Sequence, residues 1–423
     1  MQVLILGAGP AGLTVAETLR ERDRSTAITM LSSEPYAPYA PPAMADHFIT
    51  GSDETLFWKG HDVCERLGVD YRPSSSVARV EPRTRTVVLE GGTALGYDRL
   101  VLATGSRLHA PVQGSTLAGI SNFKSLRAAE SLVQRARHGE ARSAVVVGAG
   151  FIGVEVALLL AELGLRVTMV EALDRVMHRM LDGETAAIVQ AELIRRGIEL
   201  RLATPVAAFA GDGSVEHVEL ESGERLRADV YVAATGVKPN VELLAQTEIA
   251  TRWGVMVDDH LRTNVADVYA VGDVAETVDR LTGERYVHAI FPNAVEQGRV
   301  AAMNLLGDDL RYEGSESMNS LKHVGVPLIA VGALTGDDEL RWSDGAVLRK
   351  VYLTGGRIVG FRLAGDIRAA GVYRSLMLRR ENVTRFGRGL VDPWFGAGEI
   401  ALSARASVDD LRSAQDRRSA LAG

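Results

Sequence analysis

The sequence predicts an α/β protein in which a strand–turn–helix unit occurs twice and is followed by a smaller α+β segment. The chain opens with an apolar run, a glycine-rich turn and a helix-like stretch in "VLILGAGPAGLTVAETL". The same order returns in "VVVGAGFIGVEVALLL" from Val145. From residue 316 the pattern changes to strands, a Gly-Gly turn and a helix. Alternating strands and helices are typical of parallel sheets covered by helices.

Composition limits the function classes. A chain of 423 residues is too long for one ordinary core, so we expect two or three domains. The net charge of −7 argues against a nucleic-acid surface, and no apolar run reaches the roughly 18–20 residues of a membrane span. The start of the chain carries no signal-peptide pattern, so we expect a cytoplasmic protein. Cys64 is the only cysteine, which excludes an internal disulfide and a cysteine-based metal site, and we expect no metal.

The first turn has three glycines in the pattern G-x-G-x-x-G, namely Gly7, Gly9 and Gly12. They lie between an apolar strand (3–6) and a helix-like stretch (13–20). In this context the first glycine permits a tight turn, the second lets the backbone approach a pyrophosphate, and the third lets the helix pack on the strand. The helix N-terminus presents free N–H groups to the phosphates. We therefore predict a Rossmann-like fold that binds a dinucleotide.

The next strand, "AITMLSSE", ends at an acidic residue. The carboxylate of Glu34 can accept hydrogen bonds from a ribose diol. The spacing from the glycines is slightly longer than the usual ~20 residues, so Ser32 or Ser33 could share this role.

The second turn repeats the pattern at Gly148, Gly150 and Gly153, followed by a helix (154–163) and a strand that ends at Glu171. A carboxylate here would bind the 2′-hydroxyl of an adenosine ribose and repel a 2′-phosphate, which favours NAD over NADP. Arg175 lies four residues further on and could instead accommodate a phosphate.

Three further strands end in short glycine motifs. "YDRLVLATGS" ends in Ala103-Thr104-Gly105, and "VYVAATGVKPN" contains Gly236 in a second Ala-Thr-Gly. "TNVADVYAVGDVAE" ends in Gly272-Asp273, which would place a carboxylate beside the sugar or ribityl hydroxyls of a ligand.

This order of motifs resembles the two-dinucleotide-binding flavoprotein reductases of the pyridine nucleotide–disulfide oxidoreductase superfamily over roughly residues 1–310. The resemblance implies FAD in the first fold and NAD(H) in the second. "NAVEQGRVAAMNLLG" (293–307) is similar to the family's helix that points its N-terminus at the flavin ring. The implied domains are FAD-binding (1–112 and 242–315), NAD-binding (113–241) and a C-terminal α+β interface domain with a polar tail (316–423).

The resemblance assigns ligands to both dinucleotides. Those for FAD are Gly7, Gly9, Gly12, Glu34, Ala103, Thr104, Gly105, Gly272 and Asp273. Those for NAD are Gly148, Gly150, Gly153, Glu171 and Gly236.

The sequence departs from the disulfide-reductase branch, because "EPYAPYAPPAMADHF" contains no redox cysteine. Cys64 lies in a helix-like segment and is interpreted as inert. The last hundred residues contain one histidine, His323, outside any catalytic histidine motif. Thiol chemistry is therefore rejected.

"PYAPYAPPAM" resembles the "PY-x-R-PPLSK" segment of ferredoxin and rubredoxin reductases and of the flavoprotein module of nitrite reductases. The arginine is missing, and Ala45 or a neighbour replaces the lysine that lies near the flavin in those proteins. The family's partner carboxylate is present as Glu155, a candidate catalytic residue. Phe151 matches a gate over the nicotinamide site, or it packs in the core.

The C-terminal segment contains a hairpin around Gly355 and Gly356, followed by a helix in "AAGVYRSLM". Beyond it, Trp394 and Phe395 are interpreted first as core packing and second as a partner contact. We expect this domain to support a homo- or hetero-oligomer. A polar helix is expected over 407–421.

The expected function is electron exchange between NADH and an iron–sulfur protein, either free or as a subunit of a larger complex. Because the chain offers no iron–sulfur ligands, the cluster would belong to the partner. Three alternatives stay open: a stand-alone NADH oxidase, a small-molecule reductase, and a non-catalytic flavoprotein that binds NADH.

Overall fold

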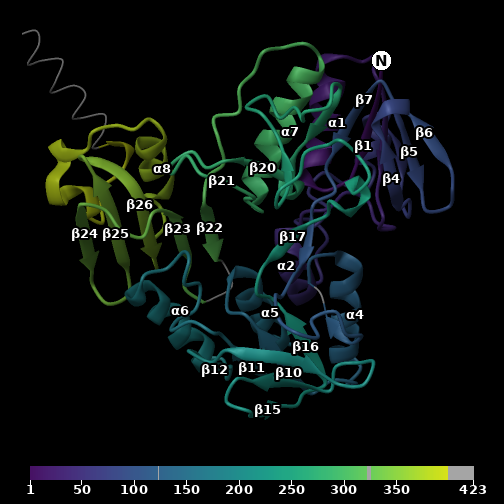
Figure 1. Cartoon of the computed structure of the whole chain (residues 1–423). Helices are drawn as coiled ribbons and strands as arrows, with labels where there is room; N and C mark the ends of the chain where they lie inside the picture. The colour runs from purple at the N-terminus through teal and green to yellow at the C-terminus, as the bar shows by residue number, and fades with distance from the viewer. Residues whose placement is uncertain (122, 322–324, 399–423) are drawn as a thin grey trace, which may run out of the picture. The chain divides into compact units, whose positions relative to one another are not determined.

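The computed structural model describes residues 1–121, 123–321 and 325–398 of the chain (Figure 1). Contacts between residues divide it into two compact units. The first contains residues 1–178 and 186–317. The second begins at Met318 and also includes the short segment Arg179–Thr185.

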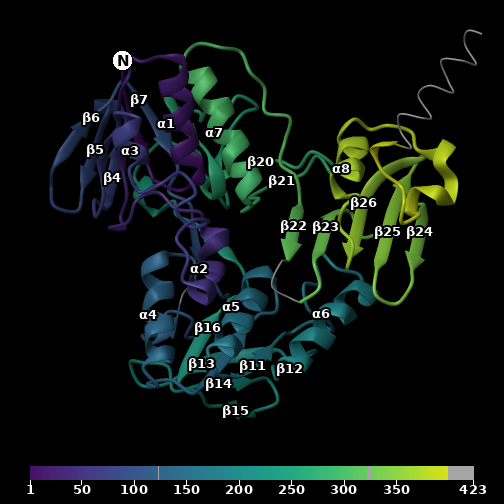
Figure 2. The same ribbon diagram turned by 180° about the vertical axis from the view of Figure 1, so that it is seen from behind.

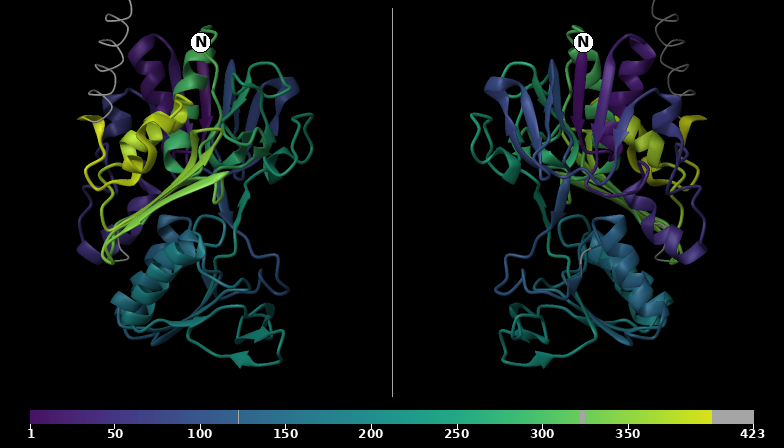
Figure 3. Two further views of the ribbon diagram at one scale, coloured as in Figure 1. Left: turned by 90° about the vertical axis from the view of Figure 1, so that its left-hand side faces the viewer. Right: turned by 90° about the vertical axis from the view of Figure 1, so that its right-hand side faces the viewer.

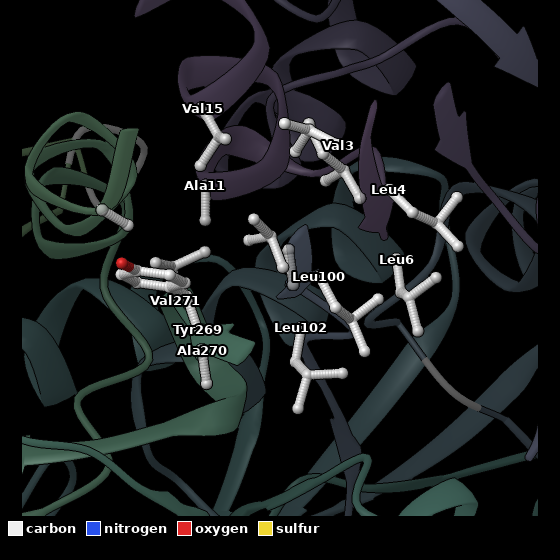
Figure 4. Packing of buried hydrophobic residues seen from close by; sticks show 14 of the residues in the cluster. Val3, Leu4, Leu6, Ala11, Val15, Leu100, Leu102, Tyr269, Ala270 and Val271 are labelled. Atoms are coloured by element: carbon white, nitrogen blue, oxygen red, sulfur yellow. The ribbon is translucent and has the colours of Figure 1, made fainter. Parts of the chain in front are cut away.

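The first unit contains a five-stranded parallel sheet with strand order β19-β7-β1-β2-β3. Its strands are β1 (Gln2–Leu6), β2 (Ala27–Leu31), β3 (Asp70–Arg72), β7 (Arg99–Leu102) and β19 (Val268–Ala270). The helices α1 (Pro10–Arg22) and α7 (Phe291–Leu305) pack against each other (Figure 2). Apolar side chains of β1, β7 and α1 meet in the core, among them Leu4, Leu100 and Ala11 (Figure 4). These strands are apolar at nearly every position because both faces of the sheet are covered.

A second five-stranded parallel sheet in the same unit has the order β12-β11-β10-β16-β9. Its strands are β9 (Ile120–Ser121), β10 (Ser143–Val147), β11 (Arg166–Val170), β12 (Glu199–Arg201) and β16 (Val230–Ala233). The helices of this part of the chain are α4 (Leu126–Arg137), α5 (Phe151–Glu162) and α6 (Gly183–Arg195). In each sheet a central strand leads through a glycine turn into a helix, β1 into α1 and β10 into α5. The predicted duplication is therefore confirmed.

Shorter elements complete the first unit. Antiparallel sheets are formed by β4 (Val77–Glu81), β5 (Thr86–Leu89) and β6 (Ala94–Gly96), by β13 (Val206–Ala210), β14 (His217–Leu220) and β15 (Arg225–Leu226), and by β8 (Ser106–Leu108) with β17 (Val237–Pro239). A mixed sheet contains β18 (Val255–Met256), β20 (Ala275–Val278) and β21 (Arg285–Tyr286). Two short helices are α2 (Met44–Thr50) and α3 (Val63–Arg66). Among the described residues, none of the helices has the length and apolar character that a membrane crossing requires.

The second unit is an antiparallel sheet with the order β22-β23-β26-β25-β24. Its strands are β22 (Met318–Leu321), β23 (Leu328–Gly332), β24 (Asp338–Ser343), β25 (Leu348–Thr354) and β26 (Arg357–Ala364). Gly355 and Gly356 join β25 to β26 with φ of 56° and 72°, a backbone conformation that favours glycine, as predicted. The helix α8 (Ala370–Leu378) packs on β26 against one face of the sheet (Figure 3). The segment η5 (Thr384–Val391) follows it.

Trp394 and Phe395 behave differently, although the sequence analysis favoured packing for both. Phe395 is 5% exposed and stacks on Tyr373 with 5.8 Å between ring centroids. Trp394 is 83% exposed, so the packing prediction is wrong for this residue. Adjacent residues in an irregular segment point in different directions, and only one of them reaches the core. The polar helix predicted over 407–421 and His323 lie outside the described residues.

Candidate functional site

Only one of the three glycines in the first turn has free space where a side chain would begin. Gly7 has φ of 117°, and a Cβ atom there would lie 2.0 Å from the Ala103 carbonyl oxygen. A Cβ on Gly12 would lie 2.0 Å from the Gly7 oxygen. A Cβ on Gly9 would meet no atom within 4 Å. The fold itself therefore requires the first and third glycines, whereas Gly9 leaves free space at the N-terminus of α1, where a phosphate would approach.

The second turn repeats this geometry. Gly148 has φ of 102°, and a Cβ there would lie 2.6 Å from the Ala234 oxygen. A Cβ on Gly153 would lie 2.0 Å from the Gly148 oxygen, and one on Gly150 would meet nothing within 4 Å. Each copy thus closes the turn against the neighbouring Ala-Thr-Gly strand and opens it toward solvent at the middle glycine. Both turns fit the pyrophosphate of a dinucleotide.

A cavity of about 540 Å³ lies at the carboxyl ends of the first sheet. Eight of the nine side chains or backbones assigned to FAD line it: Gly7, Gly9, Glu34, Ala103, Thr104, Gly105, Gly272 and Asp273. Ser32 and Ser33 also line it, and Gly12 packs behind the turn. The cavity is where parallel α/β sheets bind ligands, outside the carboxyl ends of their strands.

Lys124 lines the cavity and was missed by the sequence analysis. Its Nζ lies 2.8 Å from Asp273 Oδ2, and the Ser106 hydroxyl donates a hydrogen bond of 2.8 Å to the same oxygen. The Lys124 and Asp273 side chains are only 18% and 17% exposed. A largely buried carboxylate is stabilised by such partners. Ala45, which replaces the lysine of related reductases, is buried. Lys124 therefore supplies this cavity with a cation from another part of the chain.

Glu34 connects the first sheet to the segment that enters α4. Its carboxylate accepts hydrogen bonds from the Tyr39 hydroxyl at 2.6 Å and from the Arg127 backbone N–H at 3.1 Å. Burial, together with the Glu34 charge, raises the pKa of Tyr39 and keeps its hydroxyl a donor. Tyr39 and Arg127 also line the cavity, as do Tyr36, Pro41, Pro42, Tyr71, Ser125 and Asn240. Tyr36, Tyr39, Pro41 and Pro42 belong to the "PYAPYAPPAM" segment that the sequence analysis singled out. No local motif marks Tyr71, Ser125, Arg127 or Asn240, which come from other parts of the chain.

The N-terminus of α7 reaches the cavity through Phe291 and Ala294. Gly272 adopts φ of 75° and donates its N–H to Gln297 Oε1 of the same helix at 2.7 Å. Phe291 packs edge-on against Trp58 with ring centroids 5.6 Å apart. The helix and the Gly272-Asp273 motif are thus fixed to each other, and the positive end of the helix dipole lies at the cavity.

Glu171 ends β11 beside the second glycine turn. Its carboxylate accepts hydrogen bonds from Ala149 N–H at 2.7 Å and from Leu173 N–H at 3.0 Å. Arg175 pairs with the adjacent Asp174 at 3.0 Å. Gly236 is exposed at the end of β16, and its oxygen accepts a hydrogen bond from His109 N–H. The glycine turn, an acidic strand end and the second Ala-Thr-Gly are therefore brought to the same edge of the sheet.

Phe151 and Glu155 lie in the first two turns of α5, and both are half-buried. Neither lines the cavity of the first sheet. Their assignment as a gate and a catalytic residue stays a prediction.

Cys64 is buried in α3, and desolvation raises the pKa of its thiol to about 11. The thiolate, which is the nucleophile in disulfide chemistry, is therefore strongly disfavoured at neutral pH.

The sequence analysis found no metal-binding cluster, but the structure brings the side chains of Asp258, Asp259 and His260 within 4.8 Å of one another. The His260 ring already lies between carboxylates, 2.6 Å from Asp259 and 2.8 Å from Asp309.

The fold and the two turns define a class, the oxidoreductases with two dinucleotide-binding folds. The family model for pyridine nucleotide-disulphide oxidoreductases matches residues 1–298. The chain belongs to this family, which confirms the resemblance found in the sequence. Because the family and its structural neighbours use FAD and NAD(H), the chain is an FAD- and NAD(H)-dependent oxidoreductase.

Individual relatives cover most of the chain. The rubredoxin-NAD(+) reductase of Pseudomonas putida is 31% identical over 80% of this chain and 89% of its own length. The NADH oxidase of Methanocaldococcus jannaschii is 28% identical over 88% of this chain and 89% of its own length. The crystal structure of a ferredoxin reductase from Rhodopseudomonas palustris is similar with a TM-score of 0.84 at 27% identity, covering 95% of this chain and 99% of that one.

Proposed function

We propose that this chain transfers electrons from NADH through FAD to an iron–sulfur protein, either a free ferredoxin or rubredoxin or a subunit of a larger complex. The observation that carries the proposal is the repeated glycine turn, open only at Gly9 and at Gly150, on two sheets of one unit. One site for each dinucleotide is what hydride transfer between them requires, with the reacting atoms about 3–3.5 Å apart. The reductases similar to this chain support the acceptor class.

In this proposal each dinucleotide is bound by its own set of residues. The cavity of the first sheet holds FAD, with Glu34 at a ribose, Asp273 at the sugar or ribityl hydroxyls and Lys124 as its cation. The second turn holds NAD(H), with Glu171 at the adenosine ribose. The corresponding domains are 1–112 with 242–315 for FAD and 113–241 for NAD.

FAD, when bound, accepts a hydride and can release its electrons singly, which suits a one-electron acceptor. The chain's own part is to position both dinucleotides and to exclude competing thiol chemistry, since Cys64 is buried with a raised pKa. Glu155 and Phe151 are proposed to orient and cover the nicotinamide. We place the protein in the cytoplasm, where NADH is available.

The test compares acceptors. Purified enzyme containing FAD is mixed with NADH and one of four acceptors: a dye, a [2Fe–2S] ferredoxin, a rubredoxin or oxygen. We expect turnover with the dye and with at least one iron–sulfur protein, and slow oxygen consumption. Turnover with the dye but with neither iron–sulfur protein would overturn the assignment of the acceptor.

A second candidate is an NADH oxidase, which the similarity to the Methanocaldococcus protein favours. In that case oxygen consumption would match the rate of dye reduction, and addition of an iron–sulfur protein would not accelerate NADH oxidation.

A further inference from the structure

Trp394 has the most exposed of the large apolar side chains in the described part of the chain, at 83%. Its neighbour Phe395 is buried between Tyr373 and Phe386, at centroid distances of 5.8 Å and 5.1 Å. The backbone at this point is therefore anchored in the core of the second unit, while the indole extends into solvent.

A buried arginine fixes the two residues that precede Trp394. The Arg349 side chain is 1% exposed, and its guanidinium donates hydrogen bonds to the Asp392 oxygen at 2.7 Å and to the Pro393 oxygen at 3.0 Å. It also pairs with Asp366 at 2.7 Å. Trp394 N–H in turn binds Asp392 Oδ1 at 2.9 Å. These contacts hold the backbone that leads into Trp394 against the sheet of the second unit.

The segment that leads to Trp394 is basic, although the whole chain has a net charge of −7. Residues 366–394 contain six arginines, no lysine and three acids, a net charge of +3. Arg368 is 79% exposed and binds Asp366, the same carboxylate that pairs with Arg349. Arg385 is 47% exposed, pairs with Glu381, and lies 4.6 Å over the ring of Phe386, which contacts Phe395. Both arginines are thus one side chain away from the contacts that hold the backbone at Trp394.

We propose that Trp394, with the exposed arginines Arg368, Arg385 and Arg388, is the docking surface for an acidic iron–sulfur protein that exchanges electrons with the enzyme. This inference rests on the proposed function. Tryptophan and arginine are the residues most enriched among those that dominate binding energy in protein interfaces. Positive charge around such an anchor accelerates the association of an acidic partner. A symmetric contact between two copies of this chain would instead bring the same arginines together, which disfavours a dimer through this face.

The experiment measures NADH-dependent reduction of purified rubredoxin and [2Fe–2S] ferredoxin by three full-length proteins: wild type, Trp394→Ala and Trp253→Ala. Trp253 is the matched control, because it is 40% exposed and belongs to the first unit. We expect Trp394→Ala to raise the KM for the iron–sulfur protein at least ten-fold and to leave NADH-dependent dye reduction and the FAD spectrum unchanged. Trp253→Ala should leave this KM unchanged.

Charge is tested with Arg388→Glu, which alters an exposed residue of η5. At low salt this single variant should have a higher KM for the iron–sulfur protein than wild type. Its KM should also depend less on ionic strength. An unchanged KM for Trp394→Ala in an enzyme that reduces the iron–sulfur protein overturns the docking surface and leaves the proposed function intact. Failure of wild type to reduce either protein overturns both. A change in molecular mass of Trp394→Ala in sedimentation would identify the face as a contact between copies and would also overturn the proposal.

Discussion

Lys124 and Asp273 form an ion pair of 2.8 Å across 149 positions of sequence. Asp273 follows a strand of the first sheet, whereas Lys124 lies between β9 of the second sheet and α4. Two hydrogen bonds also join the first sheet's loops to this segment, since Arg127 N–H donates to Glu34 and Leu126 N–H donates to the Tyr39 hydroxyl. The entry to α4 therefore forms one wall of the cavity proposed for FAD, so that this cavity depends on both halves of the first unit.

Lys124→Met is expected to weaken FAD binding. The substitution removes the cation beside Asp273 and leaves a largely buried carboxylate without its ion pair, at the sugar or ribityl hydroxyls of the FAD that the cavity would hold. Loss of one charged hydrogen bond costs about 1.5–3 kcal/mol, or roughly ten- to a hundred-fold in affinity. FAD release is measured by the fluorescence of the free flavin after dilution. Lys59→Met, at an exposed ion pair with Glu17, is the control and should retain FAD.

NADH is expected to reduce the flavin about ten- to a hundred-fold faster than NADPH at low concentration, because the Glu171 carboxylate repels a 2′-phosphate. Glu171→Gln keeps a hydrogen-bond acceptor for Ala149 N–H but removes the charge. It should therefore narrow the ratio of the two reduction rates, mainly by accelerating flavin reduction by NADPH. Stopped-flow reduction with both nucleotides checks the prediction. Equal rates in the wild type would show that a cation such as Arg175 already binds the phosphate.

The sequence was sufficient for the parts of the site that depend on local geometry. Gly7 and Gly148 each require a positive φ and a close backbone approach, and such constraints leave a fixed glycine pattern in the sequence. Glu34, Asp273 and Glu171 were found because each follows a strand of a parallel sheet, and parallel strands share an edge. The positions of these residues at the ends of strands are predictable from the sequence, whereas their roles toward the dinucleotides stay predictions.

Other residues could not be found in this way. Lys124 acts through a partner 149 residues away, and no periodicity connects the two. In β25 six consecutive residues are buried, so alternation does not distinguish the buried cations Arg349 and Lys350 from their apolar neighbours. Trp394 and Phe395 lie in an irregular segment, where tertiary packing alone decides which side chain points inward.

Cys64→Ser should leave NADH-dependent reduction of the dye and of the iron–sulfur protein unchanged. With a thiol pKa of about 11, only about one molecule in a thousand carries a thiolate at pH 8. The folded protein should therefore react very slowly with a thiol reagent and should react rapidly once unfolded in urea. A charge-transfer absorption band in the reduced enzyme that disappears in the variant would place Cys64 beside the flavin and contradict this prediction.

The last prediction concerns the stability of the second unit, where Lys350 is buried among three carboxylates. Its Nζ lies 3.1 Å from Asp182, 3.0 Å from Glu184 and 3.2 Å from Glu339. The Tyr352 hydroxyl also donates to Asp182 at 3.0 Å. Burial alone would raise the pKa of Asp182, but hydrogen bonds from Thr185 and Lys350 outweigh it and lower the pKa from 3.8 to about 2.

Because folding lowers this pKa, Asp182 contributes stability above pH 3.8, and the contribution is lost as the pH falls toward 2. The shift corresponds to about 2 kcal/mol. Lys350→Met leaves the largely buried Asp182 without its cation and should destabilise the second unit by about 3–5 kcal/mol at pH 7. The loss should become smaller as the pH falls through 2, where Asp182 takes up its proton.

Hydrogen exchange of the backbone amides of β24 and β25 measures this effect within the second unit. Lys238→Met provides the control, since Lys238 is 38% exposed and lies 3.9 Å from Glu242 in the first unit. An exposed pair contributes at most about 1 kcal/mol, so this variant should leave exchange in β25 unchanged. Equal protection of β25 in wild type and Lys350→Met at pH 7 would mean that the three carboxylates relax into solvent when the lysine is removed, and that the buried cation does not hold Asp182 against this sheet.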